Sequence, residues 1–127
     1  MEKKIVYSTN APKAIGPYSQ AVWAGNLLFM SGQIALHPST GELVQENIQV
    51  ETTQVMNNIA AILTEAGLSF SAIVKTSIFL KNMDDFAAVN EVYARFFSAD
   101  FPARETVQVA KLPKDVNVEI SVIAMKA

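Results

Sequence analysis

Alternating apolar and polar residues predict three short β-strands in the N-terminal third of the chain. They are expected at 4–7, at 18–24 and at 27–31, where the segment LLFMS is almost wholly apolar. Gly25–Asn26 separates the second strand from the third, and both residues tolerate positive φ. A two-residue hairpin turn is therefore expected between these strands.

In the middle of the chain the apolar residues recur with the period of a helix. The first helix is expected from Asn47 to Ala66, with Asn47 as its N-cap and Gly67 as its C-terminal stop. A second helix is expected from about Asp84 to Phe97, and Asn82 could cap it. The apolar stripes expected to be buried are Ile48, Val55, Met56, Ile59, Ile62, Leu63 and Ala66 in the first helix, and Phe86, Val89, Val92, Tyr93 and Phe96 in the second.

A further strand is expected between the helices, at 73–81, with Val74, Ile78 and Leu80 on one face. With strands before and after, two helices can cover one face of a mixed sheet, which gives an α+β sandwich of two layers. The opposite face has no helix left to cover it. A half-apolar, uncovered sheet face is typical of a partner surface, so a homo-oligomer whose sheets face one another is expected.

The segment 101–124 has the most distinctive alternation. It predicts two strands joined by a short turn at Lys111–Asp115. Antiparallel pairing about this turn would place Gln108 near Glu119. Such a hairpin predicts one polar face, made of Arg104, Thr106, Gln108, Glu119 and Ser121.

Composition limits what this face can bind. The chain has 127 residues, of which 50% are hydrophobic and 17% are charged, so one globular domain over 1–127 is expected. The net charge of -2 gives no reason to expect nucleic acid or an anionic membrane. The absence of cysteine and the single His37 argue against disulfides, thiol chemistry and most zinc sites. No apolar run suggests a membrane span or a signal peptide, and a cytosolic, soluble, cofactor-free domain is expected.

Arg104 and Glu119 are the first candidates for chemistry. A guanidinium stays charged and binds a carboxylate through two parallel hydrogen bonds. A carboxylate can orient a water molecule or exchange protons with a reacting nitrogen. Each residue also has a structural alternative, an interface ion pair for Arg104 and a solvent-exposed strand position for Glu119.

Four segments carry a specific resemblance that spans essentially the whole chain. They are AIGPYSQAV at 14–22, SGQI at 31–34, FPAR at 101–104 and VQVAKLPKDVNVEISVIA at 107–124. Together they resemble the RidA (YjgF-like) family of reactive-intermediate deaminases. The resemblance implies a chorismate-mutase-like, two-layer α+β fold whose mixed, mostly antiparallel sheet is covered on one face by two helices. It also implies a homotrimer with clefts between subunits.

The same resemblance implies hydrolysis of 2-imino acids and their enamine tautomers, such as 2-iminobutanoate and 2-iminopropanoate, to 2-oxo acids and ammonia. It implies no metal and no organic cofactor. Arg104 would hold the substrate carboxylate, and Glu119 would position the water and move protons to the departing nitrogen. Tyr18 would close the cleft near the reacting centre. The remaining pocket positions are Ser31, Gly32, Ile34, Asn90 and Thr106.

Thr106 departs from the family pattern, because many members carry cysteine at this position. Its backbone groups could hold the water or the tetrahedral centre, and no thiol is then obligatory. Several pocket positions keep a structural alternative. Tyr18 could be a sheet aromatic whose hydroxyl reaches water, Ser31 and Gly32 could end a strand, and Asn90 could be an exposed helix residue.

Two other functions stay open at the level of sequence. The cleft could sense a 2-oxo acid or another carboxylate without turnover, in which case Arg104 would matter and Glu119 much less. Some relatives have been described as ribonucleases or translation inhibitors, which suggests an RNA-directed role. The acidic balance and the missing basic stripe argue against that role.

Overall fold

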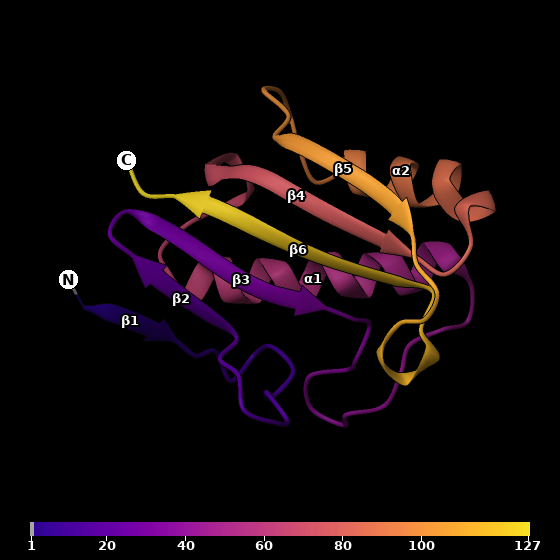
Figure 1. Ribbon diagram of the computed structural model, residues 1–127, viewed down its shortest axis with the longest axis horizontal. Coiled ribbons are helices and arrows are strands. Elements are labelled where there is room, and N and C mark those ends of the chain that lie inside the picture. Colours follow the sequence, from indigo (N-terminus) through magenta and orange to yellow (C-terminus); the bar gives the residue numbers. More distant parts are fainter. Residues whose placement is uncertain (1) are drawn as a thin grey trace.

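The computed structural model describes residues 2–127, which form one six-stranded sheet with two α-helices behind it (Figure 1). The sheet order is β1-β2-β3-β6-β4-β5, and within the described residues only the β4–β5 pair is parallel. The predicted two-layer α+β fold with a mostly antiparallel sheet covered on one face is therefore confirmed. The elements are β1 (Lys3–Val6), β2 (Ala21–Ala24), β3 (Leu27–Gln33), α1 (Ile48–Glu65), β4 (Ile73–Leu80), α2 (Phe86–Ala94), β5 (Ala103–Gln108) and β6 (Val118–Met125).

The β2–β3 hairpin forms as predicted, and Gly25 takes a φ of 61° in its turn. However, β2 begins at Ala21, so the predicted strand start at Tyr18 is wrong. Gly16 adopts a φ of 129°, and the Tyr18 N–H donates to the Gly16 carbonyl at 2.9 Å. This local turn, which only glycine adopts readily, keeps Tyr18 in the loop before the strand.

Helix α1 confirms the helical pattern and both of its end signals. The Asn47 side chain accepts a hydrogen bond from the Val50 N–H at 2.8 Å, and Gly67 follows the helix with a φ of 77°. Ile48 and Ala66, at the two ends of the predicted stripe, are only partly buried. The middle of the stripe is fully buried against the sheet: Val55, Met56, Ile59, Ile62 and Leu63.

The second helical region is shorter than predicted. A 3-10 turn at Met83–Asp85 precedes α2, and the Asn82 side chain caps that turn by accepting from the Asp84 N–H. The helix ends at Ala94, and the chain continues through three i→i+3 hydrogen bonds, donated by Arg95, Phe96 and Phe97. The burial predicted for Phe86 is wrong, because its ring is exposed at the start of α2. Val89, Val92 and Tyr93 are buried as predicted.

Strand β4 runs almost as predicted, but its pairing with β6 is irregular at the first residues of the strand. The pairing with β6 shifts between Ile73 and Lys75, which adds one residue on β4. Val74 is therefore exposed, and its predicted place beside Ile78 and Leu80 is wrong. From Thr76 onwards the even-numbered side chains face the helices.

The predicted C-terminal hairpin is wrong, because β4 lies between β5 and β6 (Figure 1). Ser77 is opposite Glu105 in the parallel pair and opposite Ser121 in the antiparallel pair. The physical reason is burial: β4 carries Ile78 and Leu80, which need a central position, whereas the mostly exposed ARETVQ of β5 suits an edge.

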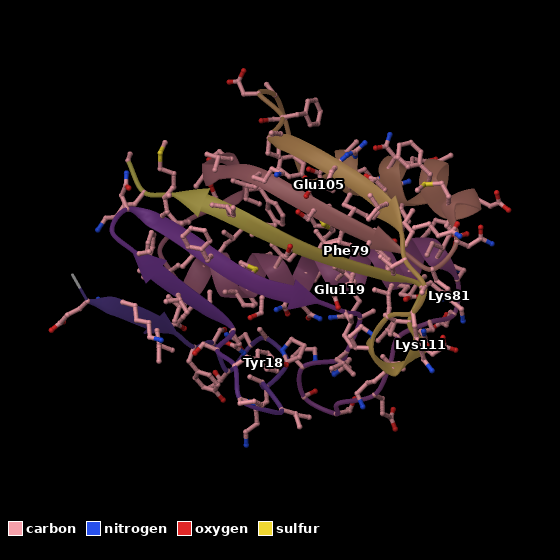
Figure 2. All side chains as sticks on the ribbon, viewed as in Figure 1. Tyr18, Phe79, Lys81, Glu105, Lys111 and Glu119 are labelled. Carbon is pink, nitrogen blue, oxygen red and sulfur yellow. The ribbon has the colours of Figure 1, made fainter. Side chains whose placement is uncertain are left out.

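This topology also divides the predicted polar face. On β5, Arg104 pairs with the buried Thr76 and so lies on the helix side. Thr106 and Gln108 share that side by the alternation of the strand. On β6, Glu119 pairs with Phe79 on the open side, as Figure 2 shows. The prediction of one shared face is wrong.

The open face of the sheet combines apolar and charged side chains. Phe29 and Val107 are exposed large hydrophobic residues, and Phe29 lies opposite Ile123. At the β5 edge, Lys75 forms an ion pair with Glu105 at 3.0 Å. Within residues 2–127, neither helix is long and apolar enough to cross a bilayer.

Candidate functional site

The predicted site residues fall around two separate cavities. The first has a volume of about 610 Å³ and lies beside the N-terminal half of β6. Its lining includes Glu119 together with Lys13 and Lys114, two cationic residues that the sequence pattern did not single out. Five of the eight predicted site residues line it: Tyr18, Ser31, Gly32, Ile34 and Glu119.

The second cavity, of about 440 Å³, lies between α2 and the start of β5. It brings together Arg104 and Asn90, with Tyr93, Phe101 and Pro102 completing most of the wall. The eighth predicted residue, Thr106, lines neither cavity. Its hydroxyl oxygen is buried and has no hydrogen-bond partner among the described residues.

A β-bulge at Ser31–Gly32 shapes the first cavity. Met30 pairs with Val122 and Gln33 with Ile120, so β3 carries one residue more than β6 across this step. A Cβ atom added to Gly32 would lie 2.5 Å from Oε2 of Glu119. Any side chain at this position would therefore displace the Glu119 carboxyl, which lies directly against the Gly32 backbone.

The same bulge is tied to the loop that carries Tyr18. The Ser31 hydroxyl donates to the Ser19 carbonyl at 2.6 Å, and the Ser31 N–H donates to the Gln20 carbonyl at 2.9 Å. Ser31 thus does more than end a strand. Tyr18, with 53% of its surface exposed, lies in the loop at the cavity and not on a strand, so its interpretation as a sheet aromatic is wrong.

The Glu119 carboxyl has a perturbed electrostatic environment. Its side chain is half-buried, and burial raises the pKa of its carboxyl above the ordinary value. Within residues 2–127, no side chain or backbone group forms a hydrogen bond or ion pair with that carboxyl. A carboxyl with a raised pKa keeps its proton to a higher pH than an ordinary glutamate does.

Arg104 is held in place by neutral groups. Its Nη1 donates to Oδ1 of Asn90 at 2.6 Å, and its Cζ lies 5.1 Å from the Tyr93 ring centre and 5.6 Å from that of Phe86. Among the described residues it has no carboxylate partner, so an ion pair within the chain is not formed. Its remaining N–H donors have no hydrogen-bond partner among the described residues.

Asn90 and Tyr93 form the support for that guanidinium. The Asn90 side chain contacts Arg104, so it is more than an exposed helix residue. The Tyr93 hydroxyl shares a 2.8 Å hydrogen bond with the Thr76 hydroxyl, which fixes the ring beneath Arg104. Burial raises the pKa of the Tyr93 hydroxyl. The sequence pattern predicted Tyr93 only as a core residue. Its position three residues after Asn90 was the signal that could have placed both side chains at the same site.

Arg104 and Glu119 of a single chain cannot both contact one small molecule. Arg104 and Glu119 lie on opposite faces of the sheet, and β4 separates their strands. Two strand spacings alone amount to about 10 Å. A site that uses both side chains must therefore take one from each of two copies.

Comparison with known proteins gives consistent matches. The family model described as Endoribonuclease L-PSP matches residues 8–126. A RutC family protein of Pyrococcus horikoshii is 52% identical over 124 residues, covering 98% of each chain. Reactive Intermediate Deaminase A, chloroplastic, of Arabidopsis thaliana is 47% identical over 124 residues, covering 98% of this chain and 66% of that protein. The crystal structure of E. coli TdcF with bound serine superposes with a TM-score of 0.93 at 45% identity, covering 98% of this chain and 99% of that one.

Proposed function

The chain belongs to the RidA (YjgF-like) family, whose model carries the description Endoribonuclease L-PSP, and on this premise we propose that it hydrolyses reactive 2-imino acids to 2-oxo acids and ammonia. A relative at 47% identity is named Reactive Intermediate Deaminase A, and a structural relative holds serine, a small amino acid with one carboxylate. The proposed substrates are 2-iminobutanoate and 2-iminopropanoate, met in the cytoplasm.

The observation that supports the proposal is that one chain presents two cavities with complementary chemistry. One presents Arg104, whose guanidinium has donors free for a carboxylate. The other presents Glu119, whose carboxyl has a raised pKa and no partner among the described residues. A 2-imino acid needs both groups, since it carries a carboxylate next to a carbon that must be attacked by water.

The hydrolysis can be written with these groups alone. The protonated imine is already electrophilic, so the reaction needs a placed water more than a strong nucleophile. Glu119 takes a proton from that water as its oxygen bonds to the imine carbon. Glu119 then returns that proton to the nitrogen and takes the remaining hydroxyl proton as the C–N bond breaks. The carbonyl forms, and the departing ammonia carries this second proton away as ammonium. Tyr18 lies beside the same cavity and would cover the reacting centre.

Assembly completes the site in this proposal. The open sheet face exposes apolar side chains such as Phe29 and Val107, and burial of such a face favours association with further copies. In a homotrimer with closed symmetry, each copy can present its Arg104 cavity to the Glu119 cavity of the next. Three equivalent clefts would result.

The test is ammonia release from freshly generated 2-iminobutanoate. The wild-type protein should accelerate release, and Glu119→Ala should lose this turnover while still binding 2-oxobutanoate through Arg104. Binding by the wild type without any turnover would instead support a carboxylate-sensing module.

An RNA-directed activity is the second candidate, because the matching family model carries the description of an endoribonuclease. The net charge of -2 gives no electrostatic support for binding a polyanion. Incubation of wild-type protein and Glu119→Ala with the same RNA would decide the matter. RNA cleavage by the wild type in the absence of imine turnover would replace the proposed function.

A further inference from the structure

Glu51 is a fully buried carboxyl group that the proposed reaction does not use. It lies in the first turn of α1 and has 0% of its surface exposed. Its Oε2 accepts the backbone N–H of Asn117 at 2.9 Å, and its Oε1 accepts Nδ2 of the same residue at 2.7 Å. Burying a carboxylate is unfavourable unless its oxygens are satisfied, so this two-point contact is a specific feature.

Asn117 connects the helix layer to the strand that carries Glu119. It precedes the first residue of β6 and stands two positions before Glu119. Its carbonyl accepts the Lys81 N–H at 3.0 Å, where the chain leaves β4. Asn117 is thus held by α1 on one side and by the end of β4 on the other.

The turn before Asn117 needs such an anchor. Lys114 and Asp115 adopt φ values of 53° and 54°, a left-handed conformation that costs free energy in residues other than glycine. Pro113 and Lys114 line the Glu119 cavity. Without an anchor, relaxation of this turn would move both the cavity wall and the start of β6.

We propose that Glu51 is a positioning residue, which acts through Asn117 to hold Glu119 in its place against the Gly32 bulge. This inference rests on the proposed function and deepens it. The clearance is small, because a Cβ atom on Gly32 would come within 2.5 Å of the Glu119 carboxyl. A shift of β6 by a fraction of an ångström therefore changes where the carboxyl meets water and substrate.

The test exchanges the carboxyl and amide groups of the Glu51–Asn117 contact in two steps. In Asn117→Asp two carboxyl groups face each other, and kcat should fall about 10-fold to 100-fold while KM, which reports the Arg104 cavity, changes less. In Glu51→Gln/Asn117→Asp the new amide can accept the backbone N–H and donate to the new carboxylate. Most of kcat should return in this double variant.

A second readout does not depend on turnover. With ¹³C-labelled glutamate carboxyls, NMR titration should show the pKa of Glu119 moving toward the ordinary value in Asn117→Ala, which removes the side-chain contact to Glu51 without adding a charge. If the wild type shows no deaminase turnover, the proposed function fails, whereas this titration still decides on the positioning role.

Two further variants separate positioning from stability. Asn117→Ala keeps the backbone contact to Glu51 and serves if Asn117→Asp does not fold. Ile62→Val, in the last turn of α1, removes one buried methyl group and lowers Tm without reaching the cavity. If Ile62→Val lowers Tm as much as Asn117→Asp does and causes the same change in kcat or in the Glu119 titration, the proposal is overturned. Unchanged kcat in Asn117→Asp, unchanged titration in Asn117→Ala, or no return of kcat in the double variant would also overturn it.

Discussion

The Arg104 cavity and the Glu119 cavity are built in opposite ways. Arg104 stands on an exposed edge strand, supported by two aromatic rings and one amide. Glu119 stands on a strand in the interior of the sheet, against a β-bulge, and is half-buried. An edge position leaves the guanidinium accessible, which suits binding. An interior position raises the pKa of an acid and fixes its geometry, which suits proton transfer.

Glu119→Gln should produce the largest effect, because it removes the proton-exchanging group and keeps the shape. We expect kcat for 2-iminobutanoate to fall by about 10²-fold to 10⁴-fold. Binding of 2-oxobutanoate, measured by calorimetry, should persist, since Arg104 is untouched. Loss of both binding and turnover would show that carboxylate binding and proton transfer are not separated between the Arg104 cavity and the Glu119 cavity.

Gly32→Ala tests how tightly the Glu119 side is built. The new methyl group would overlap the carboxyl, so either the carboxyl or β3 must move, and kcat should fall about 100-fold. Gly67→Ala is the matched control, because Gly67 has a φ of 77° and no neighbour near the added carbon. That control should lose about 1 kcal/mol of stability and retain its activity. Equal kinetics in the two variants would contradict the role of the bulge.

Arg104→Lys tests the binding side. A lysine keeps the charge but loses the two-pronged geometry and the contact with Asn90, so KM should rise about 10-fold or more with a smaller change in kcat. Oligomeric state, measured by light scattering, should not change. Arg95→Lys is the control, because among residues 2–127 Arg95 forms an ion pair only with the exposed Glu91 four residues earlier. A monomeric Arg104→Lys protein would mean that the residue is structural.

The pH dependence expected from Glu119 should give the smallest of these effects. Because burial raises its pKa, the carboxyl becomes protonated at a higher pH than an ordinary glutamate does. On acidification kcat should therefore decline before an unperturbed carboxyl would titrate, and Glu119→Gln should lack this limb. A raised pKa also means that the charged form destabilises the fold above that pKa, so Glu119→Gln should have a higher Tm at neutral pH than the wild type. A wild-type acid limb at the ordinary carboxyl value would contradict the burial effect.

Local signals predicted the parts of the molecule whose causes are local. The caps at Asn47 and Gly67 and the turn at Gly25–Asn26 involve neighbours in sequence, and all three form as expected. The strand pattern and the family resemblance both predicted site roles for Arg104 and Glu119, but neither showed that the two residues lie on opposite faces of the sheet.

The wrong predictions concern features that depend on contacts between segments distant in the sequence. Nothing within 101–124 shows that β4 enters between β5 and β6, because strand pairing is a tertiary choice. The bulges at Val74 and at Ser31–Gly32 depend on register with β6, which no single strand encodes. Tyr93 was assigned to the core because its ring is apolar, although the same ring also supports a guanidinium.

The most direct test of the divided site is complementation between two inactive variants. Arg104→Ala and Glu119→Ala are each expected to be inactive as pure proteins, because every cleft lacks one of the two groups. When the two are unfolded together and refolded in equal amounts, about one quarter of the clefts should combine an intact Arg104 with an intact Glu119 from a neighbouring copy. Recovery of about one quarter of wild-type turnover is the expected result, and mixed assemblies without any recovered turnover would contradict a site shared between copies.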